Sequence, residues 1–204
     1  VFLNDQESMM RVEASCAGGD ACLRPSVLAS LLRVRKFNLD QGIPSLSLFE
    51  WGSTFHSANG ERSEKRSLAM LSDATPDGLR PLRGVLERIA TLLCGPATSL
   101  DIDAEQAPVW YTPGGIVRIN KTPVGWAGRL SNKTLKAFGL DQPMMATELH
   151  IDDLMINWPP DIEVHALPAY PAIERDLSVI LKEDTPWQPI EEAITSLDLP
   201  FLES

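Results

Sequence analysis

The segment VGWAGRLSNKTLKAFGLDQPMMATELHI (124–151) decides the fold that we predict for this chain. Residues 124–130 and 144–151 carry the apolar, β-branched and aromatic side chains that favour strands. Between them, SNKTLKAFG (131–139) predicts a short helix, with Ser131 or Asn132 as its N-cap and with Leu135 and Phe138 facing inward. The segment therefore predicts a strand, a helix and a second strand in succession.

Working outward, short strands are also predicted at 45–51, 67–71, around 109–119 and at 176–182. Turn signals such as Asn59-Gly60 and Pro113-Gly114-Gly115 separate the strands at hairpin length. Because only a few helices lie between the strands, we predict an α+β fold built on an antiparallel sheet with flanking helices. The 16 prolines argue against an all-helical bundle.

Three more helices are predicted from apolar periodicity and end signals. PSVLASLLRVRKFNLDQG (25–42) has Pro25 at its first position, and Leu28, Leu31 and Leu32 on one face before Gly42. PLRGVLERIATLLCG (81–95) repeats apolar residues at Leu82, Val85, Leu86, Ile89 and Leu93 and ends at Gly95. TPWQPIEEAITSL (185–197) has Thr185 as its predicted N-cap.

Charge is distributed unevenly along the 204 residues, which carry a formal net charge of -10. Residues 141–204 hold 2 basic and 14 acidic side chains, whereas the rest of the chain is slightly basic. This balance disfavours a broadly basic nucleic-acid binder, and it makes direct RNA contact by the last third of the chain improbable. A membrane span is not expected either, since no run of about 18 apolar residues occurs.

A cluster of prolines at Pro159, Pro160, Pro168 and Pro171 indicates a connector between two packed units. We expect one domain over 1–158, a proline-rich linker over 159–169, and over 170–204 the first strand and helix of a truncated second domain. The chain starts at Val1 without an initiator Met or a signal peptide, so we expect it to be an internal piece of a longer protein.

The sequence lacks the patterns that usually carry catalysis or cofactor binding. Cys16, Cys22 and Cys94 form no C-x-x-C pair, and His56, His150 and His165 are isolated, so neither a disulfide framework nor a metal site is expected. No glycine-rich phosphate loop and no G-x-S-x-G elbow occurs. The adjacent carboxylates Asp152-Asp153 fit a helix N-terminus. We therefore expect no catalytic, cofactor-binding or metal-binding residue in this chain.

Four ordered blocks resemble the β subunit of bacterial phenylalanyl-tRNA synthetase. The first is LRPSVLASLL (23–32), followed by FNLDQG and LFEWGSTF (48–55). The second is LRGVLERIATLLCG (82–95) and the third is VGWAGRLSNKTLKAFGLDQPMMATELHIDDLM (124–155). The fourth, YPAIERDLSVIL (170–181), is similar to the opening of the family's C-terminal ferredoxin-like anticodon-binding domain.

The resemblance implies that residues 1–158 form a catalytic-like module with a class II synthetase-like core that does not itself aminoacylate. A class II site needs arginines for the ATP phosphates, yet the strand equivalent to motif 2, LFEWGSTF, has none, and ELHIDDLMINW has neither arginine nor glycine. ATP and magnesium are then expected to serve the whole cytoplasmic enzyme, an α2β2 assembly. The α subunit would be the partner of this chain, and tRNA would be bound by parts of the full-length subunit mostly absent here.

The resemblance also assigns family-motif positions with a structural or subunit-interface role. They are Leu23, Arg24, Phe49, Glu50, Gly52, Gly84, Glu87, Gly125, Glu148, Pro171, Arg175 and Asp176. Arg24 either meets an acidic partner at a subunit boundary or pairs with Glu50 inside the sheet. The pair Ser131-Asn132 replaces the family's usual His-Pro, and ASCAGGDA (14–21) has no counterpart.

Two other functions compete with a silent, assembly-forming fragment of phenylalanine–tRNA ligase. The first is a stand-alone small-molecule enzyme on the same scaffold, using carboxylates such as Glu50 and Asp152. The second is an RNA-binding module. ATP–pyrophosphate exchange and salt-sensitive tRNA binding by the purified chain would reveal the enzyme and the RNA binder, respectively.

Overall fold

The computed structural model of this protein describes residues 10–13, 22–58, 61–104, 107–160, 176, 178–182, 185 and 188–197. The chain divides into two compact units, Val1–Glu163 and Val164–Ser204. The first unit contains a sheet and its covering helices, and the second contains helix α5 (Gln188–Thr195). No helix in the described ranges combines the length and apolar character needed to cross a membrane.

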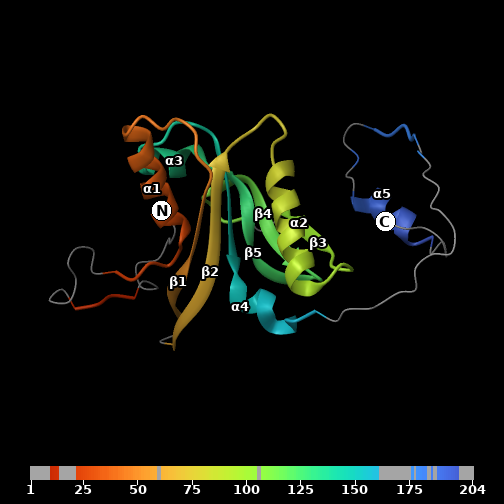
Figure 1. Cartoon of the computed structure of the whole chain (residues 1–204), viewed down its shortest axis with the longest axis horizontal. Helices are drawn as coiled ribbons and strands as arrows, with labels where there is room; N and C mark the ends of the chain where they lie inside the picture. Colours follow the sequence, from red (N-terminus) through yellow and green to blue (C-terminus); the bar gives the residue numbers. More distant parts are fainter. Residues whose placement is uncertain are drawn as a thin grey trace. The chain divides into compact units, whose positions relative to one another are not determined.

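Among the described residues of the first unit, six antiparallel strands form one sheet (Figure 1). In chain order they are β1 (Leu48–Ala58), β2 (Glu61–Asp73), β3 (Leu100–Asp103), β4 (Tyr111–Ile119), β5 (Thr122–Leu130) and β6 (Met144–His150). Their spatial order is β1-β2-β6-β5-β4-β3, so β6 lies between the β1–β2 hairpin and the β4–β5 hairpin. The α+β prediction of an antiparallel sheet with flanking helices is confirmed.

Helices cover both faces of this sheet (Figure 1). On one face, α1 (Leu28–Asp40) and α3 (Asn132–Ala137) share a core with strand residues such as Leu71 and Ala146. On the other, α2 (Arg80–Cys94) and α4 (Ile151–Leu154), which is followed by the 3-10 helix η3 (Met155–Asn157), share a core with Met145 and Leu149. The alternation of β6 side chains therefore supplies both cores.

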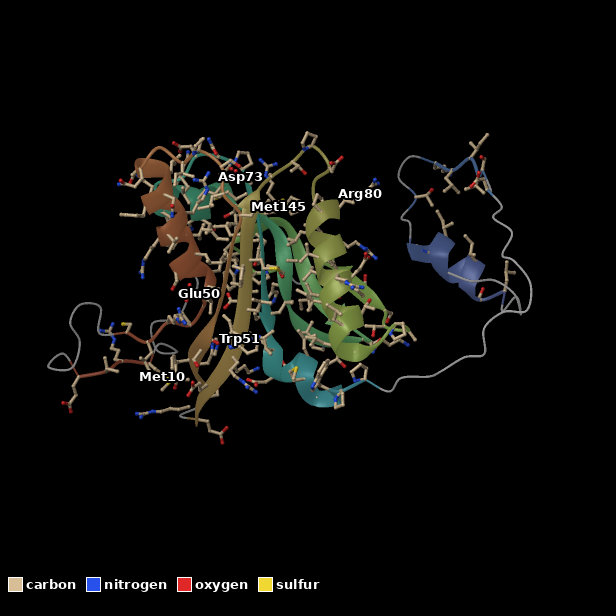
Figure 2. All side chains as sticks on the ribbon, viewed as in Figure 1. Met10, Glu50, Trp51, Asp73, Arg80 and Met145 are labelled. Carbon is tan, nitrogen blue, oxygen red and sulfur yellow. The ribbon has the colours of Figure 1, made fainter. Side chains whose placement is uncertain are left out.

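A buried arginine fixes the end of α1 to the sheet. The side chain of Arg35 is only 1% exposed, and its Nη2 donates to the carbonyl of Pro44 at 2.6 Å and to Oδ1 of Asp73 at 3.2 Å. Asp73, which is labelled in Figure 2, is the last residue of β2. The guanidinium group thus joins the loop after α1 to the end of a central strand.

The first helix begins later than its sequence predicts. Pro25 is not its first residue, because α1 starts at Leu28 with Val27 as its N-cap. The hydroxyl of Ser26 and the amide of Val27 are both bound to the Glu148 carboxylate on β6. A contact with a distant strand therefore sets the start of this helix.

The turn predicted at Pro113-Gly114-Gly115 is also wrong, because these residues lie inside β4. The chain reverses instead at Asn120 and Lys121, whose φ angles are 49° and 67°. At Gly114 the register with β5 shifts, and a Cβ on Gly128 would lie 2.4 Å from the Cα of Gly114. The glycines serve close strand approach rather than a hairpin turn.

Other predictions differ in detail from the structure. The helix predicted over 81–95 forms and ends at Gly95, but Val85 is 45% exposed while Leu82 and Leu86 are buried. Strand β3 was not predicted, and β1 and β2 extend well beyond the predicted 45–51 and 67–71. The N-cap predicted for α3 is confirmed, since Ser131 Oγ accepts a hydrogen bond from the Thr134 amide.

The strand predicted at 176–182 is not found at the described residues of that range in the second unit. Asp176 and residues 178–182 are exposed and are not in a strand, and Leu177 lies outside the described residues. A strand needs a hydrogen-bonded neighbour, and the described part of this unit provides none. Helix α5 (Gln188–Thr195) lies within the predicted 185–197, and Pro186 and Trp187, which follow the predicted N-cap Thr185, lie outside the described residues. Most of the predicted linker, residues 161–169, also lies outside them.

Candidate functional site

One face of the sheet, called the polar face below, carries the carboxylates of Glu50 and Glu148 in one row across neighbouring strands. Glu50 of β1 lies opposite Ala69 of β2, which lies opposite Glu148 of β6, which in turn lies opposite Trp126 of β5. Residues paired across an antiparallel sheet point to the same side. This is the face that α1 and α3 cover around Leu71, and the polar side chains continue along it toward His150.

Arg24 forms an ion pair with Glu50 on this face. Its Nη1 lies 2.5 Å from Glu50 Oε1, and its Nε donates to the carbonyl of Ser53 at 2.9 Å. A Cβ on Gly52 would lie 1.9 Å from Arg24 Nη2, so the guanidinium group lies directly over that glycine. Of the two roles predicted for Arg24, pairing with Glu50 inside the sheet is the one the structure shows.

Glu148 is the buried carboxylate of the row, with 6% of its surface exposed. Ser26 Oγ donates to its Oε2 at 2.5 Å, and the amide of Val27 donates to its Oε1 at 2.8 Å. Burial raises the pKa of Glu148, while these hydrogen bonds and the charge of Arg24 oppose the rise. The carboxylate fastens the start of α1 to the middle of the sheet.

Two histidines that are isolated in the sequence are connected in the structure. His56 Nε2 lies 3.3 Å from Thr54 Oγ1, Thr54 Oγ1 lies 3.2 Å from Ser67 Oγ, and Ser67 Oγ lies 3.4 Å from His150 Nδ1. Thr54 and Ser67 are fully buried. Burial, followed by the positive charge of Lys65, lowers the pKa of both histidines. The neutral form of each ring is therefore favoured.

The carboxylates proposed for a stand-alone enzyme are each bound to a different arginine. Glu50 pairs with Arg24, whereas Asp152 Oδ1 lies 2.7 Å from Arg66 Nε and its Oδ2 accepts the Arg66 amide at 2.9 Å. As predicted, Asp152 and Asp153 lie in the first turn of a helix, α4. The structure does not bring Glu50 and Asp152 together as a catalytic pair.

The predicted family-motif positions fall into three groups. Arg24, Glu50, Gly52 and Glu148 gather on the polar face, with Gly125 beside the backbone of Glu148. Leu23 bonds through its amide to the Met10 carbonyl, Phe49 is 76% exposed on β1, and Gly84 and Glu87 lie on α2, where Glu87 pairs with Arg83. Asp176 is exposed, and Pro171 and Arg175 lie outside the described residues.

Ser26, Thr54 and Ser67 belong to this site but are not predicted from the sequence, in which His56 and His150 are isolated. Strand alternation could have indicated part of this set. Thr54 and His56 on β1 are two residues apart and share a face, as do Lys65 and Ser67 on β2. No group of three or more potential metal ligands occurs among the residues that the structure describes. Cys22 and Cys94 are free thiols, and Cys16 lies outside those residues.

Comparison with known proteins identifies the family. The model of the family described as "Phenylalanyl tRNA synthetase beta chain CLM domain" matches residues 2–151 of the chain. The chain therefore belongs to the phenylalanyl-tRNA synthetase β chain family. The matched region contains the whole sheet, including the Arg24–Glu50 pair and the Glu148 carboxylate.

Curated relatives of this phenylalanyl-tRNA synthetase β chain family member are phenylalanine–tRNA ligase β subunits. That of Clostridium tetani is 24% identical over 98% of this chain and 26% of its own length. That of Rhodopseudomonas palustris is 29% identical over 74% of this chain and 20% of its own length. That of Paramagnetospirillum magneticum is 30% identical over 65% and 18%, respectively. The chain thus spans about a quarter or less of these relatives.

A solved structure of a different synthetase has a similar fold. It is the pyrrolysyl-tRNA synthetase of Desulfitobacterium hafniense, with a TM-score of 0.59 over 74% of this chain and 52% of the other. The two are 13% identical in sequence, so the similarity concerns the fold alone. The antiparallel sheet with flanking helices is therefore shared with a tRNA synthetase.

Proposed function

We propose that this chain is the catalytic-like module of a phenylalanine–tRNA ligase β subunit, and that it assembles with the α subunit without performing aminoacylation itself. The whole class II enzyme, an α2β2 assembly in the cytoplasm, would join phenylalanine to its tRNA with ATP and magnesium. Membership in the β chain family and the relatives' description as β subunits support this proposal.

The main support for the proposal is the position and the binding partners of the arginines near the polar face. Holding ATP requires guanidinium groups that point at phosphate oxygens. No arginine occurs in β1 or in Met144–Leu154, and Arg24, which does reach the face, is bound by Glu50 and the Ser53 carbonyl. Buried Glu148 adds a carboxylate where a nucleotide would bring negative charge. The charged groups of this face bind one another and the protein backbone, which disfavours binding of a triphosphate.

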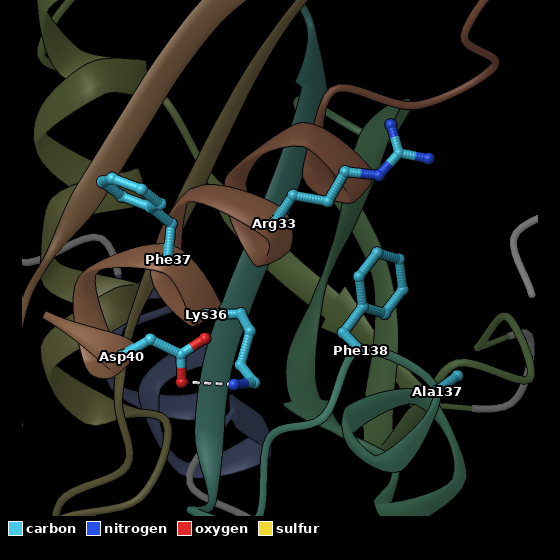
Figure 3. Close-up of a pocket in the computed structure, with 6 residues that line it drawn as sticks. All are labelled: Arg33, Lys36, Phe37, Asp40, Ala137 and Phe138. Carbon is cyan, nitrogen blue, oxygen red and sulfur yellow. Dashed lines mark hydrogen bonds and ion pairs between the residues drawn. The ribbon is translucent and has the colours of Figure 1, made fainter. Parts of the chain in front are cut away.

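We assign the contact with the α subunit to the outward side of α1. Phe37 is 64% exposed and Val34 is 43% exposed on this helix. A groove of about 580 Å³ lies between α1 and the end of α3, and Arg33, Phe37 and Phe138 line it together with the bonded pair Lys36 and Asp40 (Figure 3). Exposed aromatic rings beside arginine are typical of protein interfaces.

Residues 170–204 would belong to the C-terminal ferredoxin-like anticodon-binding domain of the full-length subunit. The Pro-x-x-x-Arg-Asp pattern of Pro171–Asp176 supports this assignment. We place tRNA binding in other parts of the subunit, because acidic side chains prevail after residue 140 and repel phosphates.

Two measurements test the proposal. ATP–pyrophosphate exchange with phenylalanine should be absent from the purified chain and present when a longer β chain is mixed with the α subunit. Exchange by the chain alone would show that it is an enzyme in its own right. Co-purification of the chain with the α subunit should be lost in Phe37→Asp and kept in Leu92→Asp, which places the same charge at an exposed site on α2.

A further inference from the structure

Strand β1 forms one edge of the six-stranded sheet (Figure 1). Along an antiparallel strand, the N–H and C=O groups of every second residue point to the same edge. Arg24 shows which residues point outward, because its carbonyl accepts the Phe55 amide at 3.0 Å and its Nε donates to the Ser53 carbonyl at 2.9 Å. The register with β2 is continuous, so the backbone groups of Phe49 and Trp51 point outward as well.

Arg24 covers only part of this edge. It binds the outward groups at Ser53 and Phe55, whereas those of Phe49 and Trp51 have no hydrogen-bond partner among the residues that the structure describes. The side chains of Phe49 and Trp51 are 76% and 57% exposed. Proteins usually protect an open edge with charged side chains, proline or a covering segment. Two exposed aromatic residues at an open edge therefore indicate that another strand pairs there.

The aromatic side chains of this open edge continue an apolar surface of the sheet. Phe49 lies opposite Met70 and Trp51 lies opposite Leu68 on β2. Met70 and Leu68 are partly buried against the core that α2 and α4 share with the sheet. Glu50, labelled with Trp51 in Figure 2, lies on the opposite face, where Arg24 holds its carboxylate. The open edge thus offers free backbone groups together with an apolar surface on one face.

We propose that the open edge of β1 pairs antiparallel with the same edge of a second copy of this chain, about a two-fold axis at Glu50. In this register Phe49 of each copy lies opposite Trp51 of the other. Every outward N–H of these two residues then donates to an outward C=O of the other copy, so no group is left over. This self-match selects a second copy as the occupant. The inference goes beyond the assembly role and does not depend on it.

The side chains are compatible with this register and predict a weak dimer. Aromatic side chains directly opposite each other on antiparallel strands attract. Phe and Trp each bury about 150–250 Å², so covering the exposed fractions of Phe49 and Trp51 in both copies removes about 400–650 Å² from water. This area is roughly half of the 1,000 Å² that a stable interface needs. The two Glu50 carboxylates meet on the other face, each neutralised by its own Arg24 at 2.5 Å.

Sedimentation equilibrium of the purified 204-residue chain tests the proposal. It should show a monomer–dimer equilibrium with a dissociation constant of about 50 μM. Trp51→Lys should weaken the dimer at least about tenfold, because a lysine protects an open edge from pairing. The matched variant Leu92→Lys, at a residue of α2 that is 54% exposed, should leave the dissociation constant unchanged. A chain that stays monomeric, or equal losses in the two variants, would overturn the proposal.

Phe37→Asp separates this contact from the one assigned to the α subunit. Phe37 lies on α1, away from the outward edge of β1, so this variant should lose the α subunit and still form the dimer. Loss of the dimer in Phe37→Asp would place the contact on α1 and overturn the proposal. Loss of α-subunit binding in Trp51→Lys would not restore it, because the two measurements are independent.

Hydrogen exchange tests the pairing without a substitution. The amides of Phe49 and Trp51 should exchange about fourfold more slowly at about 500 μM protein than at about 5 μM, since most of the chain is dimeric only at the higher concentration. The Ser57 amide, which also points outward from β1 but lies beyond Arg24, should exchange at the same rate at both concentrations. A dimer that leaves the exchange of Phe49 and Trp51 unchanged would overturn the proposal.

Discussion

The hydroxyl group of Ser26 donates a 2.5 Å hydrogen bond to Oε2 of Glu148, joining the start of α1 to the central strand β6. The amide of Leu28 donates in turn to Ser26 Oγ at 3.1 Å. Buried carboxylates are tolerated only where such donors surround them. This contact lets a charged residue serve as the attachment point between helix and sheet.

Glu148→Gln should make the protein at least as stable as the wild type at pH 8. Burial raises the pKa of Glu148, so the folded protein holds this proton more firmly than the unfolded chain does. The stability that this proton provides is complete below the ordinary glutamate pKa of about 4.3 and is lost as the pH rises through the raised pKa. Urea denaturation from pH 4 to pH 8 should show the wild type losing stability relative to the variant.

Two further variants control this prediction. Glu87→Gln, at an exposed residue of α2 that pairs with Arg83, should change the stability at pH 8 by no more than about 0.5 kcal/mol. Glu148→Ala should be destabilised by about 2 kcal/mol at pH 4, because Ser26 and Val27 lose their acceptor, and this deficit should shrink toward pH 8 as the wild type loses stability. A wild type that gains stability over Glu148→Gln with rising pH would contradict the direction of the shift.

Arg35→Ala should cost about 3 kcal/mol of unfolding free energy. The substitution removes a fully buried cation and leaves the Pro44 carbonyl and the Asp73 carboxylate without this donor. Arg33→Ala, on the exposed side of the same helix, should change stability by no more than about 0.5 kcal/mol. Equal effects of the two substitutions in urea denaturation would mean that the buried network does not hold the end of α1.

Local sequence signals predicted the parts of the fold that depend on neighbouring residues. Ser131 caps α3, and Gly95 ends α2, because both positions satisfy backbone groups a few residues away. The turn prediction at 113–115 is wrong because its glycines allow close approach of the partner strand β5, which the local pattern does not include. The start of α1 depends on Glu148, 121 or more residues distant.

The polar face was predicted only in part for the same reason. Arg24 and Glu50 both lie in the first block of the family pattern, and their pairing is one of the two expected roles of Arg24. The link between His56 and His150 requires β6 to lie beside β2, although the two strands are 70 residues apart in the sequence. Strand order, rather than residue type, creates this part of the site.

Gly52→Ala should break the ion pair between Arg24 and Glu50. The new Cβ would lie 1.9 Å from Arg24 Nη2, so the guanidinium group has to move away. The expected loss is about 1–2 kcal/mol, corresponding to the hydrogen bonds that Arg24 makes. Arg24→Ala should add little to Gly52→Ala, since both remove the same contacts, and a thermodynamic double-mutant cycle measures this coupling.

Gly84→Ala is the matched control for this prediction. No heavy atom lies within 4 Å of a Cβ placed there, and Gly84 lies on the exposed side of α2. The substitution should stabilise the protein by about 0.5–1 kcal/mol, because alanine favours the helix. Full additivity of Gly52→Ala and Arg24→Ala would show that the glycine acts independently of the ion pair.

Asp152→Asn should lower stability by less than about 1 kcal/mol at pH 7, because the Asp152–Arg66 pair is partly exposed to solvent. The Arg66 amide and guanidinium group lower the pKa of Asp152. Its contribution is therefore present above the ordinary aspartate pKa of about 3.9 and is lost as the pH falls through the lowered value. Urea denaturation at pH 7 and below pH 3 should show the difference from the wild type shrinking in acid.

Asp153→Asn, whose carboxylate makes no ion pair in the described part of the chain, should lose less stability at pH 7. Equal losses for the two substitutions would mean that Arg66 does not stabilise the fold through Asp152.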